Sequence, residues 1–507
     1  MIGALFLAAT IQSTRPNIVL IFTDDHATQA ISAYGSKINR TPAIDALARR
    51  GVRFDRFYTT NPICAPSRAS LLTGKYSHIN GHRDNRTRFD GGQPTLPKLL
   101  RPAGYTTALI GKWHLESEPE GFDHWEILPG QGSYYNPDFI TKDGRHREPG
   151  YVTDIVTEKS LAWLDRHPKD NPFLLMVQHK APHRNWEPAP RHYSLYKDQT
   201  IPEPPDLFRD YMGLNSGAEK CLMQIGRDMI HRTDLKIGYT PSRMDEDQKK
   251  LWDAAYRPQD EAFERQHPMG IARTRAYYQR YIKDYLRCIA AVDDSVGRIT
   301  EHLKKSELDK NTVVIYCSDQ GFFLGEFGWY DKRWFYEPSS RTPLIVSWPG
   351  VGKAGLATNR LAANVDILPT LLEIAGATIP AEVQGVSLAP LVRNPASKQV
   401  RHSVYGHFYE SDDPDHKTPK YVALRTERYK VIFYEDLGEW ELFDLKNDPK
   451  EHRNLAREPR HRGLLKKQAD LLVREQDSLQ ESPDSLQRTR DAFARLWDSN
   501  FFAVHLS

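Results

Sequence analysis

The sequence of 507 residues has little of several things that would point to common classes of protein. Its four cysteines show no metal-ligand spacing and are too few for a disulfide scaffold, although a single disulfide stays open. It has no run of about 18 apolar residues, so we expect no membrane-spanning helix. A net charge of only +3 gives no argument for a nucleic-acid partner. Internal repeats and low-complexity segments are also missing.

The N-terminus reads "MIGALFLAATIQSTRPN", with an apolar run from Ile2 to Ala9 followed by small and polar residues. This order is typical of the apolar core and cleavage zone of a secretory signal, although the basic start of such a signal is missing. The alternative is an ordinary apolar start to a domain. We expect residues 1–13 to be a signal segment and the protein to be periplasmic or secreted.

Apolar, β-branched runs alternate with helical patterns over most of the chain. The runs that predict buried strands are 17–22, 105–110, 173–178, 312–317 and 344–348. The patterns that predict helices are 41–51, 95–105, 151–167, about 274–305 and 365–377. This alternation predicts an α/β domain with a large, mostly parallel sheet sandwiched by helices. We place that domain at residues 14–395.

Two other regions have a different texture. Residues 200–273 are rich in charge and proline and have weak periodicity, which predicts an insertion that packs over the domain near the site. Short β-patterned runs after about Pro395 predict a small antiparallel sheet, and a charged helical tail begins near residue 460. We therefore expect a smaller C-terminal subdomain at residues 396–507.

Charged and metal-binding residue types follow four of the predicted strands. They are Asp24 and Asp25, Lys112 and His114, His183, and Asp319 and Gln320. After any one strand such residues are ordinary loop residues. Four such strand ends together predict one site, because ligands of α/β sheets bind beyond the carboxyl ends of the strands.

Three of these residues are carboxylates that would repel one another if they met unpaired. A divalent cation with oxygen ligands removes this repulsion, and Ca²⁺ suits a set of three aspartates with the Gln320 amide beside them. The alternative is that one or two of the aspartates cap helices or turns.

Cations crowd around the same place. Arg68, Lys112, His114, His183 and Lys332 would surround the metal, and an anionic group such as sulfate or phosphate explains that density. Cys64 lies just before Pro66, at the start of a predicted helix, where backbone N–H groups also favour an anion. A thiolate nucleophile at this place is the alternative.

Short motifs then connect these residues to a known family. The stretch "CAPSR", within "NPICAPSRASLLTG", resembles the Cys-x-Pro-Ser-Arg pattern of the type I sulfatases, which belong to the alkaline-phosphatase-like superfamily. The motifs "FTDD", "GKWH", "APH", "SDQG" and "YDKRWFYE" follow in the order of that family. The resemblance therefore covers nearly the whole chain and implies an enzyme that hydrolyses sulfuric esters.

The resemblance implies a modified nucleophile. In the family the cysteine is oxidised to formylglycine (3-oxoalanine), so Cys64 would be the substrate of a formylglycine-generating or anaerobic sulfatase-maturating enzyme. One hydroxyl of the aldehyde hydrate attacks sulfur, and the other lets the intermediate collapse and expel sulfate. Arg68 and Lys112 would hold the hydrate, and His114 would handle its proton.

The remaining implied roles concern the sulfate and the metal. His183 and Lys332 would face the sulfate and the leaving oxygen. The expected ligands of one Ca²⁺ per chain are Asp24, Asp25, Asp319 and Gln320.

The substrate expected from the resemblance is a sulfated sugar or glycan. Several stretches look similar to bacterial carbohydrate sulfatases, including N-acetylglucosamine-6-sulfatase-like members. Candidate sugar contacts are His82, Arg83, Arg184, Trp186, Arg333 and Trp334, although the aromatic residues are equally typical of a core. Two other functions stay open. One is a phosphonate or phosphate monoester hydrolase of the same superfamily, and the other is a non-catalytic glycan-binding protein with unmodified Cys64.

Overall fold

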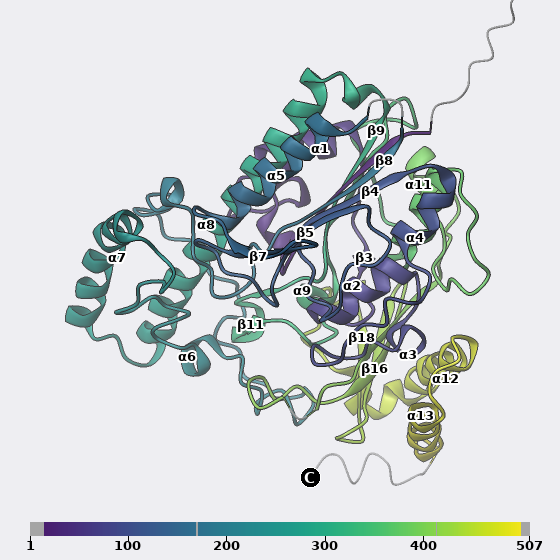
Figure 1. Cartoon of the computed structure of the whole chain (residues 1–507). Helices are drawn as coiled ribbons and strands as arrows, with labels where there is room; N and C mark the ends of the chain where they lie inside the picture. Colours follow the sequence, from purple (N-terminus) through teal and green to yellow (C-terminus); the bar gives the residue numbers. More distant parts are fainter. Residues whose placement is uncertain (1–14, 169–170, 412, 498–507) are drawn as a thin grey trace, which may run out of the picture.

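A large sheet between two layers of helices forms the body of the molecule (Figure 1). The computed structural model describes residues 15–168, 171–411 and 413–497, so the predicted signal segment at 1–13 lies outside the described residues. Within the described part of the chain, no helix has the length and apolar character needed to cross a membrane.

The sheet has ten strands, and its centre is parallel. The order across the sheet is β13 (Leu356–Thr358), β2 (Val52–Phe54), β12 (Leu344–Ser347), β9 (Thr312–Ser318), β1 (Asn17–Thr23), β8 (Phe173–Gln178), β4 (Thr106–Lys112), β5 (His124–Leu128), β6 (Asp138–Thr141) and β7 (Gly144–Arg147). The five strands from β9 to β5 run parallel to one another. β12 is antiparallel to both its neighbours, and β6 and β7 form an antiparallel pair. These pairings confirm the predicted mostly parallel sheet.

Alternation along the strands explains the two helix layers, because successive side chains point to opposite faces of a sheet. In β1, Val19 and Ile21 join one core, whereas Ile18 and Leu20 join the other. The first core is covered by α1 (Pro42–Arg50), α5 (Val152–Arg166) and α8 (Gly270–Lys305). The second is covered by α2 (Cys64–Thr73), α4 (Leu96–Leu100), α10 (Ile367–Ile374) and α11 (Ala389–Arg393). The middle of a central strand is therefore apolar on both faces.

The C-terminal part contains the predicted small antiparallel sheet. Its strands are β15 (Ser403–Phe408), β16 (Tyr421–Thr426), β17 (Tyr429–Tyr434) and β18 (Glu439–Asp444), paired in sequence order. The helical tail forms α12 (Arg462–Ser478) and α13 (Pro483–Arg495), and both pack on the core of this sheet. The boundary at residue 395 stays a prediction.

Residues 200–273, predicted as an insertion, contain a long helix that their weak periodicity did not predict. Besides the short α6 (Ile225–Asp228), it contains α7 (Glu246–Gln266), which starts with a capping box between Asp245 and Gln248. Trp252 and Tyr256 are the residues of α7 that the core covers. With so few buried positions over six turns, the sequence has no strong apolar stripe to reveal the helix.

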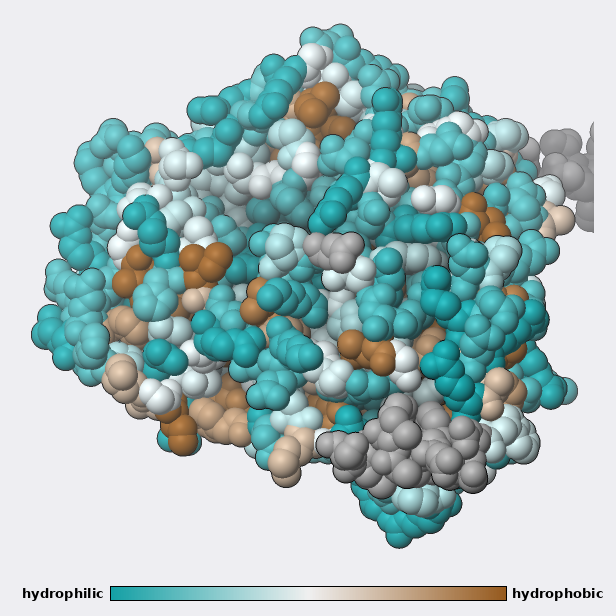
Figure 2. All heavy atoms as spheres, turned by 90° about the horizontal axis from the view of Figure 1, so that it is seen from below, coloured by the Kyte–Doolittle hydropathy of each residue, from teal (hydrophilic) through white to brown (hydrophobic). Residues whose placement is uncertain are grey.

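The sequence left a single disulfide open among the four cysteines. All four cysteines belong to the described residues, and each is buried and unbridged, so the disulfide that the sequence left open is not formed. On the face that Figure 2 shows, hydrophilic side chains dominate and the apolar ones form separate spots.

Gly111 lies where two strands of the sheet approach each other closely, next to the site. It lies in β4 with φ +115°, and an added Cβ would stand 1.9 Å from the backbone oxygen of Gln178 in β8. We expect Gly111→Ala to lower the free energy of unfolding by about 3 kcal/mol or more, because it adds a clash to the backbone strain. Urea unfolding measures the loss.

The matched control is Gly35→Ala, since Gly35 has φ +88° and no atom within 4 Å of the added Cβ. That variant carries the backbone strain alone, and we expect it to cost about 1 kcal/mol. Equal losses in the two variants would contradict the proposed clash.

Candidate active site

The carboxyl ends of the parallel strands bring the predicted residues to one edge of the sheet. Phe22 in β1 lies beside both Cys317 of β9 and Gln178 of β8. Asp24 and Asp25 therefore emerge next to Asp319, which follows β9, and the Asp25 backbone N–H donates to Asp319 Oδ1 at 3.1 Å. The register of the strands sets these positions.

Cys64 is the first residue of α2 and is fully buried. Its Sγ lies 3.4 Å from Asp24 Oδ1 and 3.2 Å from Lys332 Nζ. The Gln320 amide nitrogen is 3.6 Å from the same sulfur. The thiol therefore points from the helix N-terminus into the group of charges at the sheet edge.

Arg68 lies one turn along α2 and is also buried. Its Nη2 donates to Asp24 Oδ2 at 3.2 Å and to Asp319 Oδ2 at 3.1 Å. Its Nη1 donates to Gln178 Oε1 and to the Lys112 backbone oxygen, both at 2.9 Å. Sequence reasoning missed Gln178, because it is the last residue of a strand and nothing marks it as polar support for an arginine.

Lys112 and His114 come from the end of β4 and the loop beyond it. Lys112 Nζ donates to Asp24 and to the side-chain oxygen of Gln131. Burial, followed by the charge of Lys112, lowers the pKa of His114 to about 2, so its imidazole is neutral. His114 Nδ1 is buried and has no hydrogen-bond partner in the described part of the chain.

The three carboxylates offer oxygen atoms within 4.8 Å of one another. Burial and then Asp24 raise the pKa of Asp319 to about 8, and burial also raises the pKa of Asp25. Burial also acts to raise the pKa of Asp24. Lys112, His183 and Arg68 outweigh this effect and together hold that pKa well below the usual value. Burial thus opposes the ionisation of Asp25 and Asp319, and a cation between the aspartates would favour it.

The Gln320 side chain supplies a further oxygen at this place. Its Nε2 donates to Asp25 Oδ1 at 2.6 Å, whereas its Oε1 is buried without a hydrogen-bond partner among the described residues. An unpartnered buried oxygen next to three carboxylates is the donor set of a hard divalent cation.

His183 and Lys332 approach the carboxylates from two other segments. Lys332 Nζ lies 2.7 Å from both oxygens of Asp25. His183 Nδ1 lies 2.6 Å from the Arg184 backbone oxygen, so Nδ1 carries a proton and Nε2 is left facing Asp25, 3.8 Å from Oδ2. Burial, and next Lys112, lower the pKa of His183 well below its usual value.

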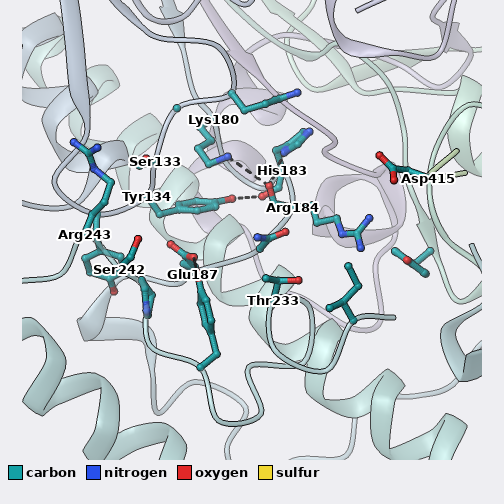
Figure 3. Close-up of a pocket in the computed structure, with 18 of the residues that line it drawn as sticks. Ser133, Tyr134, Lys180, His183, Arg184, Glu187, Thr233, Ser242, Arg243 and Asp415 are labelled. Atoms are coloured by element: carbon teal, nitrogen blue, oxygen red, sulfur yellow. Dashed lines mark hydrogen bonds between the residues drawn. The ribbon is translucent and has the colours of Figure 1, made fainter. Parts of the chain in front are cut away.

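A pocket of about 700 Å³ opens from His183 (Figure 3). Tyrosine rings and hydroxyl, amide and charged side chains line it together. Some of these come from the insertion, including Thr233, Tyr239, Ser242 and Arg243, and others come from the C-terminal loop at 414–416. Aromatic faces next to hydrogen-bonding groups suit a small polar ring such as a sugar.

The six predicted sugar contacts differ in their position relative to the pocket. Arg184 lines the pocket and is held by Asp234, with Nε 2.7 Å from Oδ1. Arg333 is bound to Asp331 Oδ1 at 2.6 Å. Arg83 is exposed and lies over the ring of Tyr409, outside the pocket lining.

Three of the six predicted contacts lie outside the pocket lining and have almost no exposed surface. Trp186 and Trp334 are 0% exposed and His82 is 1% exposed. Trp186 packs on Tyr281, Trp334 stacks on Tyr336, and His82 lies against Phe89. The two tryptophans belong to the core, which was the alternative that the sequence allowed for the aromatic residues, and a sugar contact by any of the three stays a prediction.

The pocket also contains residues that sequence reasoning missed. Lys180 lies in "HKAPH", directly before the motif of His183, and its position there was a usable signal. Tyr134, Glu187 and Asp415 come from irregular loops, where no periodicity or motif identifies a residue that faces a ligand.

Comparison with known proteins adds an independent finding. A family model described as "Sulfatase" matches residues 16–377, and one described as "N-sulphoglucosamine sulphohydrolase, C-terminal" matches residues 325–478. The chain is 44% identical over 466 residues to an N-acetylglucosamine-6-O-sulfatase of Bacteroides thetaiotaomicron, covering 88% of this chain and 83% of that protein. It is 26% identical over 464 residues to an ulvan-active sulfatase of Formosa agariphila, with 88% and 78% covered.

A solved structure is also similar. It is described as a complex with its substrate D-glucosamine-2-N,6-O-disulfate, and it matches with a TM-score of 0.90 and 41% identity. The match covers 92% of this chain and 98% of that one.

Proposed function

Since the chain belongs to the sulfatase family and is a sulfatase, we propose that it hydrolyses an O-sulfate ester of a sugar. The preferred substrate in this proposal carries its sulfate on O6 of N-acetylglucosamine or a related glucosamine. Two similar proteins support this choice, because one is named for that activity and the other is described with a 6-O-sulfated glucosamine.

One observation carries the proposal. The buried side chain of Cys64 lies within 3.4 Å of both a carboxylate and an ammonium group. His183, which offers a ring nitrogen within 4.8 Å of the same sulfur, lines a pocket that suits a sugar. A sulfate ester presents one negative charge at the end of a polar ring. The cations at the sheet edge suit the sulfate, and the tyrosines and hydroxyls of the pocket suit the ring.

Cys64 in this proposal acts after conversion to formylglycine. A cysteine nucleophile needs its thiolate, whereas burial and then Asp24 raise the pKa of Cys64 to about 12. Formylglycine supplies a hydrate hydroxyl as nucleophile and a second hydroxyl for release of sulfate. Because Cys64 has no exposed surface, the maturating enzyme must reach it before the fold closes.

The residues that would hold a Ca²⁺ are Asp24, Asp25, Asp319 and Gln320. They fit the ion, since three carboxylates converge and the unpartnered Gln320 Oε1 is the kind of neutral oxygen that Ca²⁺ accepts. The cation would supply positive charge to the non-bridging sulfate oxygens.

Other residues would orient the nucleophile. Hydrogen bonds to Asp24, Asp319 and Gln178 hold the guanidinium group of Arg68 in place, one helical turn from residue 64. Lys112 donates to the same Asp24 oxygen, Oδ2, as Arg68 does. His114 Nδ1 is buried and has no partner within the described chain, so in this proposal it is the atom placed to accept a proton from the nucleophile.

His183 and Lys332 would act on the leaving oxygen. The Arg184 carbonyl holds the Nδ1 proton of His183, so Nε2 faces the site. Nε2 would give a proton to the sugar oxygen from the imidazolium form, which the negative charge of the bound sulfate favours. Lys332 reaches Cys64 Sγ at 3.2 Å and carries its charge to the same place. A sugar alcohol leaves poorly as an alkoxide, so this proton transfer matters for sugar substrates.

The first prediction tests the function and the nucleophile together. We expect the matured wild-type protein to desulfate N-acetylglucosamine-6-sulfate in preference to 2-O- and 4-O-sulfated sugars, aryl phosphates and phosphonates. Cys64→Ser should abolish turnover in a host without an enzyme that converts serine. Released sulfate is measured by ion chromatography, and the mass of the peptide containing residue 64 reports its conversion.

Several outcomes would contradict this proposal. Wild-type-like turnover by Cys64→Ala would show that residue 64 is not the nucleophile. A matured protein that prefers aryl phosphates would favour a phosphomonoesterase. Tight binding of the sugar sulfate without any turnover by converted protein would favour a glycan-binding protein.

The second prediction concerns the metal. We expect Ca²⁺ to raise the melting temperature of the wild-type protein, because a ligand that binds only the folded state stabilises it. Asp319→Asn should remove most of that shift and most of the activity. A melting series in EDTA and in increasing Ca²⁺ gives the measurement.

Asp444→Asn is the matched control, since Asp444 pairs with Arg428 on the antiparallel sheet and lies outside the carboxylate cluster. The metal assignment fails if Asp319→Asn keeps both the Ca²⁺-dependent shift and full activity in EDTA.

The third prediction concerns His183. We expect His183→Ala to reduce kcat/KM for the sugar sulfate about 100-fold or more, since general acid catalysis contributes about two to four orders of magnitude. The loss on an aryl sulfate with an acidic phenol should be at least about tenfold smaller, because that leaving group needs no proton. Equal losses on the two substrates, with an unchanged melting temperature, would reject the acid role.

A further inference from the structure

The loop that follows β5 places one amide between Lys112 and the sugar pocket. Gln131 Oε1 accepts a hydrogen bond from Lys112 Nζ at 2.5 Å, and the same residue lines the pocket. Neither the motifs nor the comparisons assign a role to this residue. Gln131 therefore contacts Lys112 and also lines the pocket, and the proposed function uses neither of these contacts.

Strand pairing and a tight turn fix this amide. Leu128 is the register partner of Lys112 in the pair of β5 with β4, and Gln131 comes three residues later. The Gly132 N–H donates to the Pro129 oxygen at 2.9 Å, which closes a four-residue turn around Gln131. At Gly132, φ is +68° and an added Cβ would stand 2.8 Å from Leu128 Cδ1, so the turn packs tightly on the strand.

The chemistry of the contact sets the direction of the amide. An ammonium group can only donate, so the oxygen of Gln131 must face Lys112 and the NH₂ group must face away from it. In the part of the chain that the structure describes, Nε2 of Gln131 has no hydrogen-bond partner, and the side chain is half-buried. Ser133 and Tyr134, which follow closely, also face the pocket (Figure 3).

We propose that Gln131 is a positioning residue that donates its amide N–H to an oxygen of the bound sugar while its carbonyl holds Lys112. This inference rests on the proposed function, because it needs a sulfated sugar in the pocket. Gln131 thereby couples recognition of the sugar to the position of the lysine next to the nucleophile. An aryl sulfate has no ring hydroxyls or ring oxygen and cannot use the N–H groups in this way.

Two variants separate the two halves of the amide. Gln131→Glu keeps an oxygen for Lys112 and loses both donors. We expect KM for N-acetylglucosamine-6-sulfate to rise about tenfold, the effect of one lost hydrogen bond of about 1.4 kcal/mol, with a smaller change in kcat. On an aryl sulfate, the loss in kcat/KM should be smaller, because that substrate makes no hydrogen bond to the Gln131 N–H groups. Gln131→Met loses both groups, so we expect kcat to fall on both substrates as well.

Gln266→Glu is the control for the change of an amide into a carboxylate, since Gln266 is an exposed residue at the end of α7. It should leave all kinetic constants unchanged. The inference is wrong if Gln131→Glu alters the two substrates by the same factor, or if Gln131→Met leaves kcat unchanged. Melting temperatures check that each variant is folded.

A binding measurement separates failure of this inference from failure of the proposed function. In the Cys64→Ser protein, calorimetry with N-acetylglucosamine-6-sulfate should show a Kd that Gln131→Glu weakens about tenfold, again the effect of one hydrogen bond. An unchanged Kd overturns only the role of Gln131. No binding by the Cys64→Ser protein, together with no turnover by the matured wild type, overturns the proposed function and this inference with it.

Discussion

The site depends on a buried balance of charge at one edge of the sheet. Three carboxylates, Asp24, Asp25 and Asp319, meet the cations of Arg68, Lys112 and Lys332, and all six side chains are almost fully buried. Removing one member of such a group leaves an uncompensated buried charge, which costs about 3–5 kcal/mol. Adding a divalent cation gives the group an excess of positive charge. That excess would suit the binding of a sulfate ester and the charge that develops on its oxygens.

The strand ends explain why the centre of this site was predictable. Apolar strands buried on both faces can expose polar groups only at their ends, so Asp24, Lys112 and Asp319 stood out in the sequence immediately after such runs. The topology rule then places those ends at one edge. The large sheet, the small antiparallel sheet and most helices followed from the same patterns, because burial and secondary structure agree in these elements.

The rest depended on packing that the sequence does not encode locally. Trp186 and Trp334 stand beside motif residues, yet they fill the core, since neighbours in sequence can face opposite sides of a loop. The exposed helix α7 lacks an apolar stripe because little of it is covered. The pocket combines loops at about 131–135, 180–187, 228–243 and 414–416, and only the tertiary fold brings segments so distant in sequence together.

These loops also connect specificity to chemistry through the backbone around His183. The Tyr134 hydroxyl donates to the His183 backbone oxygen at 2.6 Å, and Lys236 of the insertion donates to the Asn185 oxygen. Asp234, from the same insertion, grips Arg184 with both carboxylate oxygens. The Arg184 carbonyl in turn fixes the tautomer of His183. Residues 228–243, which line the pocket, are therefore also connected to the backbone that orients the imidazole of His183.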